Sequence, residues 1–211
     1  MKELYKIIRN FIPKEDCDLM ARKLESLLLK GIYRAPDPLC PKSPAFYGIF
    51  NDELEIYRSK VEKEIEEDIW PSYTYARIYQ EKEFMPPHLD RPGAEISLTI
   101  TLDYEKFIWP IYIQKNNYEF EEIILDIGDA LVYQGSLASH MRHPMLGQDF
   151  QHQTFFHYVR KNGEYDNNKF DEHEELLSNA EAEKWNFSNW SDHDWREDPE
   201  KLINIVKEQG D

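Results

Sequence analysis

The chain has 211 residues, 41% of them hydrophobic and 14% aromatic, enough to bury the core of one domain but few for two. Its formal net charge of −16, from 41 acidic and 25 basic residues, repels phosphate backbones and anionic membranes. The composition therefore predicts one domain with a tail, and it argues against nucleic acid and membranes as partners.

The opening of the chain and its cysteines indicate a protein of the cell interior. The stretch MKELYKIIRNFIPKEDC lacks the apolar segment and cleavage site of a secretory signal, and no apolar run reaches the roughly 20 residues of a membrane span. Cys17 and Cys40 are too few for a disulfide framework and lack CxxC spacing. We therefore expect reduced, structural thiols and a cytoplasmic location.

Two amphipathic helices are expected in the first third of the chain. In residues 14–30, apolar side chains recur at helical spacing, and Gly31 follows. In residues 52–70, the same spacing continues as far as Ile69, and Pro71 ends it. Each helix needs an apolar surface on which to pack.

Six short segments rich in β-branched and aromatic residues follow, separated by turns that contain Pro, Gly, Asn and Asp. Because no helical pattern separates them, they predict an antiparallel sandwich or barrel. The expected strands cover residues 72–80, 95–102, 109–114, 121–127, 129–135 and 151–160.

Strict alternation in EISLTITL, residues 95–102, separates two faces of one strand. The Ile and Leu side chains share one face, while Ser97, Thr99 and Thr101 share the other. The apolar face can receive the helices. The hydroxyl face either meets water or lines a polar cavity, and periodicity does not distinguish these two arrangements.

The last part of the chain, residues 164–211, is polar and acidic but contains Trp185, Trp190 and Trp195. Three tryptophans are unusual in a disordered tail, so we expect part of it to pack on the domain formed by residues 1–163. A short helix is expected near PEKLINIVKEQ. The acidic and His residues of this extension lack regular ligand spacing, which favours a solvated surface.

His88 and Asp90 lie in MPPHLDRPGAEISLTITLDY, just before the alternating strand. In an extended segment, residues i and i+2 point to the same side, so this imidazole and carboxylate can reach one ion. Nonheme Fe(II) oxygenases use two His and one carboxylate and leave the other coordination positions open. His140, at the end of a later strand and turn, is the candidate third ligand, and His143 is its rival.

Four stretches in this order resemble the 2-oxoglutarate- and Fe(II)-dependent oxygenases of the prolyl 4-hydroxylase-like group: YARIYQEKEFMPPHLDRPGAEISLTITL, WPIYI, GDALVYQGSLASHMRHP and HQTFFHYV. The opening IIRNFIPKEDCDLMARKL is also similar to that group's first strand and helix. The likeness spans about residues 5–163. It implies a mainly β fold with flanking helices (α+β), namely a double-stranded β-helix, a jelly-roll or cupin-like barrel, with the N-terminal helices packed on one sheet.

The resemblance also implies a site. His88, Asp90 and His140 would match the HxD…H triad that holds Fe(II), with 2-oxoglutarate and O2 as cosubstrates and ascorbate as a further candidate cofactor. Thr99 and Thr101 would face the cavity and the cosubstrate. The implied reaction hydroxylates an unactivated C–H bond and releases succinate and CO2. The carboxylate of Asp90 argues against a halogenase, because halogenating members of the family give up this ligand.

One feature departs from the family. Such enzymes place an Arg or Lys about ten residues after the distal His to pair with the far carboxylate of 2-oxoglutarate, but here that region reads QDFQHQ. A buried dicarboxylate still needs a cation. Arg142 is the first substitute, since it follows His140 by two residues. Arg77 is the second, two residues before Tyr79, which matches a cosubstrate-binding tyrosine of the family, and His152 is the third.

Substrate contacts are expected from Arg91, Tyr75 and Tyr133. Other roles stay open: Arg91 could cap the turn that follows it, and either arginine proposed as an anchor could instead pair with a structural carboxylate such as Glu95. His157 is expected in the core or beside the ligands.

Two other protein classes remain open. A cupin-like barrel such as an isomerase would bind metal without consuming 2-oxoglutarate, and a noncatalytic binding module would show no turnover. The substrate could be a prolyl residue in a peptide, an amino acid or another small molecule, because a fold does not select a substrate. The sequence carries no information on the oligomeric state.

Overall fold

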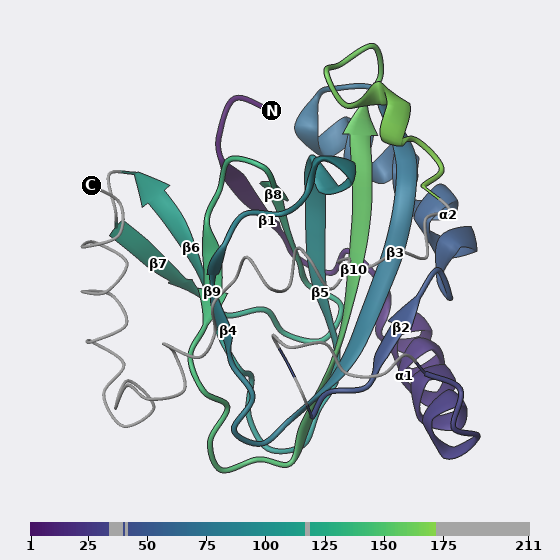
Figure 1. The fold of residues 1–211 in the computed structure, drawn as a ribbon, viewed down its shortest axis with the longest axis vertical. Helices are drawn as coiled ribbons and strands as arrows, with labels where there is room; N and C mark the ends of the chain where they lie inside the picture. Colours follow the sequence, from purple (N-terminus) through teal and green to yellow (C-terminus); the bar gives the residue numbers. More distant parts are fainter. Residues whose placement is uncertain (34–39, 41, 117–118, 172–211) are drawn as a thin grey trace, which may run out of the picture.

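The computed structural model describes residues 1–33, 40, 42–116 and 119–171 (Figure 1). Two sheets, both antiparallel, make up most of this part. The six-stranded sheet has the order β1 (Tyr5–Ile8), β8 (Ala130–Gln134), β5 (Ile96–Tyr104), β10 (Phe150–Arg160), β3 (Ile69–Gln80) and β2 (Ala45–Tyr47). The four-stranded sheet has the order β4 (Met85–His88), β9 (His140–Arg142), β6 (Ile111–Asn116) and β7 (Glu119–Ile123).

Two α-helices are described, α1 (Lys14–Leu29) and α2 (Asn51–Ile65), together with 3-10 turns at Pro92–Ala94 and Asp166–Asn168. The first helix matches its prediction. The second ends earlier than expected, because Glu66 adopts a left-handed φ of 58° and Ile69 begins β3 instead. Within the described residues, no helix is long and apolar enough to cross a membrane.

The six-stranded sheet has two different faces. Its outer face packs on the helices, since Leu98 and Phe156 share one buried core with Leu24 of α1 and Leu54 of α2. Figure 1 shows β6 and β7 at the other side of this sheet from α1. The prediction of helices packed on one sheet is thus confirmed.

The inner face of the six-stranded sheet meets the four-stranded sheet. Tyr133 pairs with Ser97 across the β5–β8 ladder and packs against Ile111 and Ile113 of β6. Directly paired residues of antiparallel strands share a face, so Ser97 lies on the inner side too. The hydroxyl face of the alternating strand therefore lines the space between the sheets. A double-stranded β-helix remains a prediction, since these pairings do not close the sheets into a barrel.

Several strands differ in extent from the sequence prediction. β3 starts at Ile69, three residues early, and includes Pro71 beside an irregularity in its ladder with β10. β7 covers Glu119–Ile123, so the second half of the expected strand at 121–127 is not β structure. β4 has the sequence MPPH, which is short and rich in proline, and such a pattern does not predict a strand. It was therefore expected only as an extended segment.

The start of the C-terminal extension contacts the domain. The amide of Phe170 donates to the carbonyl of Pro71 at 2.8 Å, and the Tyr47 hydroxyl donates to the carbonyl of Asp171 at 3.0 Å. The Ser72 hydroxyl donates to the carbonyl of Asn168. The three tryptophans and the expected helix near PEKLINIVKEQ lie outside the described residues.

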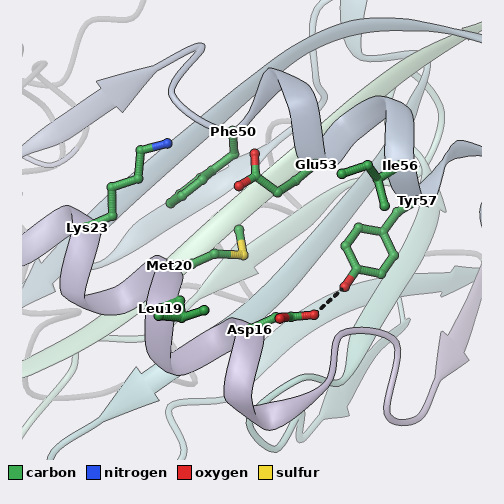
Figure 2. Close-up of a pocket in the computed structure, with 8 residues that line it drawn as sticks. All are labelled: Asp16, Leu19, Met20, Lys23, Phe50, Glu53, Ile56 and Tyr57. Carbon is green, nitrogen blue, oxygen red and sulfur yellow. Dashed lines mark hydrogen bonds between the residues drawn. The ribbon is translucent and has the colours of Figure 1, made fainter.

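A groove of about 280 Å³ separates α1 and α2 on the outer side of the six-stranded sheet (Figure 2). The hydroxyl of Tyr57 donates to Asp16 Oδ2 across it at 3.2 Å. The groove lies on the helical side, away from the inner face. Its lining residues are Asp16, Leu19, Met20, Lys23, Phe50, Glu53, Ile56 and Tyr57.

Cys17 should resist thiol reagents until the protein unfolds. Its side chain is fully buried, and burial raises the pKa of the thiol to about 12, with Asp18 and Asp16 adding to the rise. Because the thiolate is the reactive species, a Cys40→Ser variant at pH 8 should react with a disulfide reagent at least about 100-fold more slowly when native than in urea. Equal rates in the two states would contradict this burial.

Candidate active site

Two short strands bring the predicted metal ligands together. His88 of β4 lies opposite His140 of β9, with ring centroids 4.2 Å apart. Asp90 follows two residues later, and its amide donates to the carbonyl of Gly135 at 2.8 Å. The Nε2 atoms of His88 and His140 lie 3.9 and 3.6 Å from Asp90 Oδ1. One ligand atom from each of the three residues therefore falls within 4.8 Å of the others.

Hydrogen bonds orient both imidazole rings. Nδ1 of His88 lies 2.8 Å from the carbonyl oxygen of Pro86, and Nδ1 of His140 lies 3.1 Å from that of Ala138. A carbonyl only accepts, so each Nδ1 carries the proton. Each Nε2 then faces Asp90, as in histidines that bind metals.

Asp90 is held by a chain of polar groups that the sequence did not reveal. Its Oδ2 accepts a hydrogen bond from the Ser97 hydroxyl at 2.6 Å, which leaves Oδ1 facing the imidazoles. Nδ1 of His157 lies 3.0 Å from the same hydroxyl and donates to it, because the serine proton goes to Asp90. Ser97 was expected only as a cavity hydroxyl, and the pairing of β5 with β10 supplies its partner.

Burial and neighbouring charges set the protonation of these groups. Burial lowers the pKa of His140 to about 4, and nearby His88 adds to the shift. Burial alone would raise the pKa of Asp90, but His140, His157, His88 and the Ser97 hydrogen bond together lower it. At neutral pH the site thus offers the neutral imidazole of His140 and the Asp90 carboxylate, with the ring of His88 beside them, a donor set that suits a divalent transition metal.

Arg142 lies beside the triad on the same strand. It is 3% exposed, and its guanidinium donates to the carbonyl of Trp109 and lies 4.8 Å above that ring. Burial lowers its pKa to about 10, opposed by Tyr79 and Tyr133, so it stays charged at neutral pH. Within the described residues, Arg142 forms no ion pair. A buried cation without an anion is costly, so this guanidinium is a candidate partner for an anionic ligand.

Arg77 also lies on the inner face, because it pairs with Gln153 in the β3–β10 ladder. It is 3% exposed, with its guanidinium 5.0 Å from the ring of Tyr75 and 5.9 Å from that of Tyr79. Burial raises the pKa of the Glu83 carboxyl, and the positive charge of Arg77 opposes this rise. Arg77 thus has a carboxylate neighbour of its own.

Glu95, the example of a structural carboxylate that could pair with either arginine, contacts Arg160 instead. Its Oε1 forms an ion pair with Arg160 Nη1 at 2.7 Å, and its Oε2 accepts the amide of Arg160 at 2.8 Å.

His152 cannot serve as a cosubstrate anchor, so that prediction is corrected. It pairs with Ile78 of β3, a residue of the core under the helices, and with Asp103 of β5. Its side chain therefore points to the outer face, opposite to the triad. The β3–β10 ladder is regular here, so alternation along β10 puts His152 on the face opposite to Gln151 and Gln153.

Neutral side chains of β10 line the inner face of the six-stranded sheet at the region QDFQHQ. Gln153 donates to Thr99 Oγ1 at 2.8 Å and accepts from Thr101 at 3.4 Å and from Gln151 Nε2 at 3.0 Å. The backbone amide of Trp109 donates to the side-chain Oε1 of Gln151 at 2.9 Å. Thr99 and Thr101 thus lie on the inner face as expected, with Gln153 as their partner.

One of the three expected substrate contacts lies at the triad, and a second lies on the inner face of the six-stranded sheet. The Tyr133 hydroxyl is 3.3 Å from His140 Nε2, and Tyr75 lies on the inner face opposite Phe155. Arg91 is engaged elsewhere: its Nη1 forms an ion pair with Asp171 Oδ2 at 2.7 Å, and its Nε donates to a tyrosine hydroxyl at 3.1 Å.

His143, the rival third ligand, is not part of the triad. Its ring packs 4.4 Å from that of Tyr112. It follows Met141, which packs with Phe84 and Phe120 on the other face of the four-stranded sheet. Alternation along the extended chain thus separates His143 from His140.

No family model and no curated protein matches this sequence. Solved structures do match the fold. A prolyl-4-hydroxylase of Pseudomonas putida aligns with a TM-score of 0.60 and 12% identity, over 76% of this chain and 94% of that one. HygX from Streptomyces hygroscopicus, solved with nickel and 2-oxoglutarate, aligns with a TM-score of 0.59 and 11% identity, over 75% and 84% of the two chains.

A third match catalyses a different reaction. SnoN, a non-heme α-ketoglutarate-dependent epimerase from nogalamycin biosynthesis, aligns with a TM-score of 0.60 and 8% identity, over 75% of this chain and 78% of that one. Similarity at this level of identity establishes the fold and leaves the reaction open. The chain therefore has the fold of the 2-oxoglutarate- and Fe(II)-dependent oxygenases of the prolyl 4-hydroxylase-like group.

Proposed function

We propose that this protein is an Fe(II)- and 2-oxoglutarate-dependent dioxygenase that hydroxylates an unactivated C–H bond of a prolyl residue, an amino acid or another small substrate. The observation that carries the proposal is the convergence of His88, Asp90 and His140 beside the buried Arg142, which forms no ion pair with the described residues. In this proposal the two sheets are the halves of a double-stranded β-helix. The partner is a small molecule or peptide in the cytoplasm, since a net charge of −16 disfavours nucleic acid and membranes.

The residues present fit the metal. Two neutral imidazoles and one carboxylate on one side of an ion are the donor set of nonheme Fe(II) sites. When bound, Fe(II) would supply the redox chemistry that couples oxidative decarboxylation of 2-oxoglutarate to C–H oxidation. Ser97 keeps Asp90 oriented by holding Oδ2, and Pro86 and Ala138 keep both imidazoles in the ligating tautomer.

Arg142 is the proposed anchor for the far carboxylate of 2-oxoglutarate. It shares β9 with His140, so a dicarboxylate held at the metal by one end can present its other end to this guanidinium. Tyr79 and Tyr133 lie near enough to act on its charge, and their hydroxyls are further candidate contacts for the cosubstrate. Arg77 is the weaker candidate, because Glu83 lies within reach of its charge.

The test is an anaerobic titration of the pure protein with Fe(II) and 2-oxoglutarate, monitored by the weak visible charge-transfer absorption of the chelate. We expect the band in the wild type and its loss in His140→Ala. Iron binding without the band would favour a cupin-like isomerase or a binding module. Absence of iron binding would contradict the proposal outright.

Arg142→Gln should weaken 2-oxoglutarate binding by about 30- to 1,000-fold, because a buried charge-assisted pair contributes on the order of 2–4 kcal/mol. Iron affinity measured without cosubstrate should change little. Arg142→Lys should recover part of the loss, since it restores charge without the bidentate geometry. Arg91→Gln is the matched control, because Arg91 is paired with Asp171. Equal weakening by both substitutions would remove Arg142 from the anchor role.

A further inference from the structure

A second group of potential ligands lies on the other side of the six-stranded sheet. Glu25 of α1, Asp103 of β5 and His152 of β10 each place one ligand atom within 4.8 Å of the other two. His152 pairs with Ile78, a residue of the core under the helices, so its side chain faces α1. The group is therefore separated from the triad by the thickness of the sheet.

A β-bulge brings Asp103 into this group. Ser97, Thr99 and Thr101 alternate onto the inner face, and regular continuation would place Asp103 there as well. Instead, the β5–β10 ladder shifts, so that Gln153 opposes Thr101 while His152 opposes Asp103. The extra residue turns the Asp103 carboxylate to the side of His152. Bulges commonly redirect a side chain in this way at functional sites.

His152 has a buried nitrogen without a partner. Its side chain is 3% exposed, and within the described residues Nδ1 forms no hydrogen bond. Asp103 Oδ2 lies 4.0 Å from Nδ1, which is too far for a hydrogen bond. Two ligand atoms that each lie about 2.0–2.2 Å from one ion are roughly 3–4 Å apart, so this separation fits an ion between them.

The charges and the protonation state of the group also favour a cation. Neither Glu25 nor Asp103 forms an ion pair with a lysine or arginine of the described residues. Burial lowers the pKa of His152, although Asp103 and Glu25 oppose the shift, so the imidazole is neutral at neutral pH and can donate a lone pair. Asp103 Oδ1 accepts the amide of Tyr104 at 2.9 Å, which holds the carboxylate in place.

We propose that Glu25, Asp103 and His152 form a second cation site, for a divalent transition metal of the zinc type. One imidazole and two carboxylates are ligands that Zn²⁺ accepts, with the remaining position open to water. Asp103 and Glu25 are partly or largely exposed, so the ion can enter from solvent. Binding would tie α1 to β5 and β10, which gives the ion a structural role distinct from the triad's chemistry.

The test is a Zn²⁺ titration of the full-length His140→Ala protein by calorimetry, in which the triad is disabled. We expect one equivalent with a dissociation constant at or below about 10 μM. Adding Asp103→Asn should weaken this binding at least about 30-fold, and adding Glu25→Gln about tenfold. Zn²⁺ should raise the thermal unfolding midpoint of His140→Ala but not of the double variant with Asp103→Asn.

The controls separate this site from others. Glu15→Gln removes another acidic residue of α1 and should leave Zn²⁺ binding unchanged. If His140→Ala destabilises the protein, the same Zn²⁺ titration is carried out on the His88→Ala protein, which also lacks a complete triad. Binding that survives Asp103→Asn, or no binding in either background, would overturn the assignment. Asp103→Asn alone should bind Fe(II) and 2-oxoglutarate as the wild type does. The Zn²⁺ titration therefore tests the second cation site, and the Fe(II)–2-oxoglutarate titration separately tests the proposed function.

Discussion

Asp90→Ala is expected to lower Fe(II) affinity at least about 100-fold and 2-oxoglutarate turnover at least about 1,000-fold. Asp90 is the only carboxylate of the triad and lies 3.6 Å from His140 Nε2 and 3.9 Å from His88 Nε2. Its removal leaves two neutral imidazoles to hold a divalent ion. Metal affinity is measured by anaerobic titration, and turnover by succinate release.

Ser97→Ala is the graded control for this substitution. It keeps all three ligands but removes the 2.6 Å hydrogen bond to Asp90 Oδ2 and the acceptor of His157. Loss of such an outer contact costs about 10- to 100-fold in metal affinity, so Ser97→Ala should fall between Asp90→Ala and the wild type. If Asp90→Ala bound Fe(II) as tightly as the wild type, the triad would not be the metal site.

Gly135→Ala is expected to destabilise the protein by about 2–4 kcal/mol and to weaken metal binding. A Cβ at this position would lie 2.2 Å from the carbonyl oxygen of Ala94, 2.7 Å from Asp90 Oδ2 and 2.7 Å from Ser97 Oγ. The nearest of these atoms belongs to the backbone and cannot rotate away. The amide of Gly135 donates to Glu95 and its carbonyl accepts from Asp90, so this segment is fixed at both ends.

Urea unfolding of the metal-free protein measures the loss of stability, and the Fe(II) titration measures the effect on the site. Gly31→Ala is the matched control. Gly31 has a φ of +69°, yet nothing lies within 4 Å of an added Cβ, so only a backbone cost of about 1 kcal/mol is expected. A Gly135→Ala protein as stable as Gly31→Ala would contradict the close approach described here.

Much of the architecture follows from local periodicity. The apolar stripe of residues 14–30 identified α1 within one residue, because helical spacing places those side chains on one buried face. For the second helix, the same spacing predicted an end that is too late. Ile69 fits the apolar stripe, but the left-handed conformation of Glu66 ends the helix before it. A single residue in an unusual conformation is invisible to a pattern that averages over turns.

The candidate active site was likewise predicted in part from local patterns. Spacing alone placed His88 and Asp90 on one side of an extended segment, and the resemblance to the oxygenases selected His140. Gly135, whose carbonyl accepts the Asp90 amide, carries no sequence signal because the two residues lie far apart in the chain. Ser97 was expected as a cavity hydroxyl, but alternation does not show that this hydroxyl donates to Asp90. His152 was considered as an anchor, although alternation along β10 places it on the outer face. The bulge that redirects Asp103 toward it depends on the pairing of two strands and could not be predicted.

By itself, the sequence determined which side chains share a face within one element: the helical stripes, the hydroxyl row of EISLTITL and the HxD pair. Only the tertiary structure decided which faces meet, by placing β4 beside β9 and directing Arg142 between the sheets. The physical reason is that rotation along one helix or strand is set by local backbone geometry. Contacts between elements depend instead on register, bulges and packing, which residues far apart in the chain determine together.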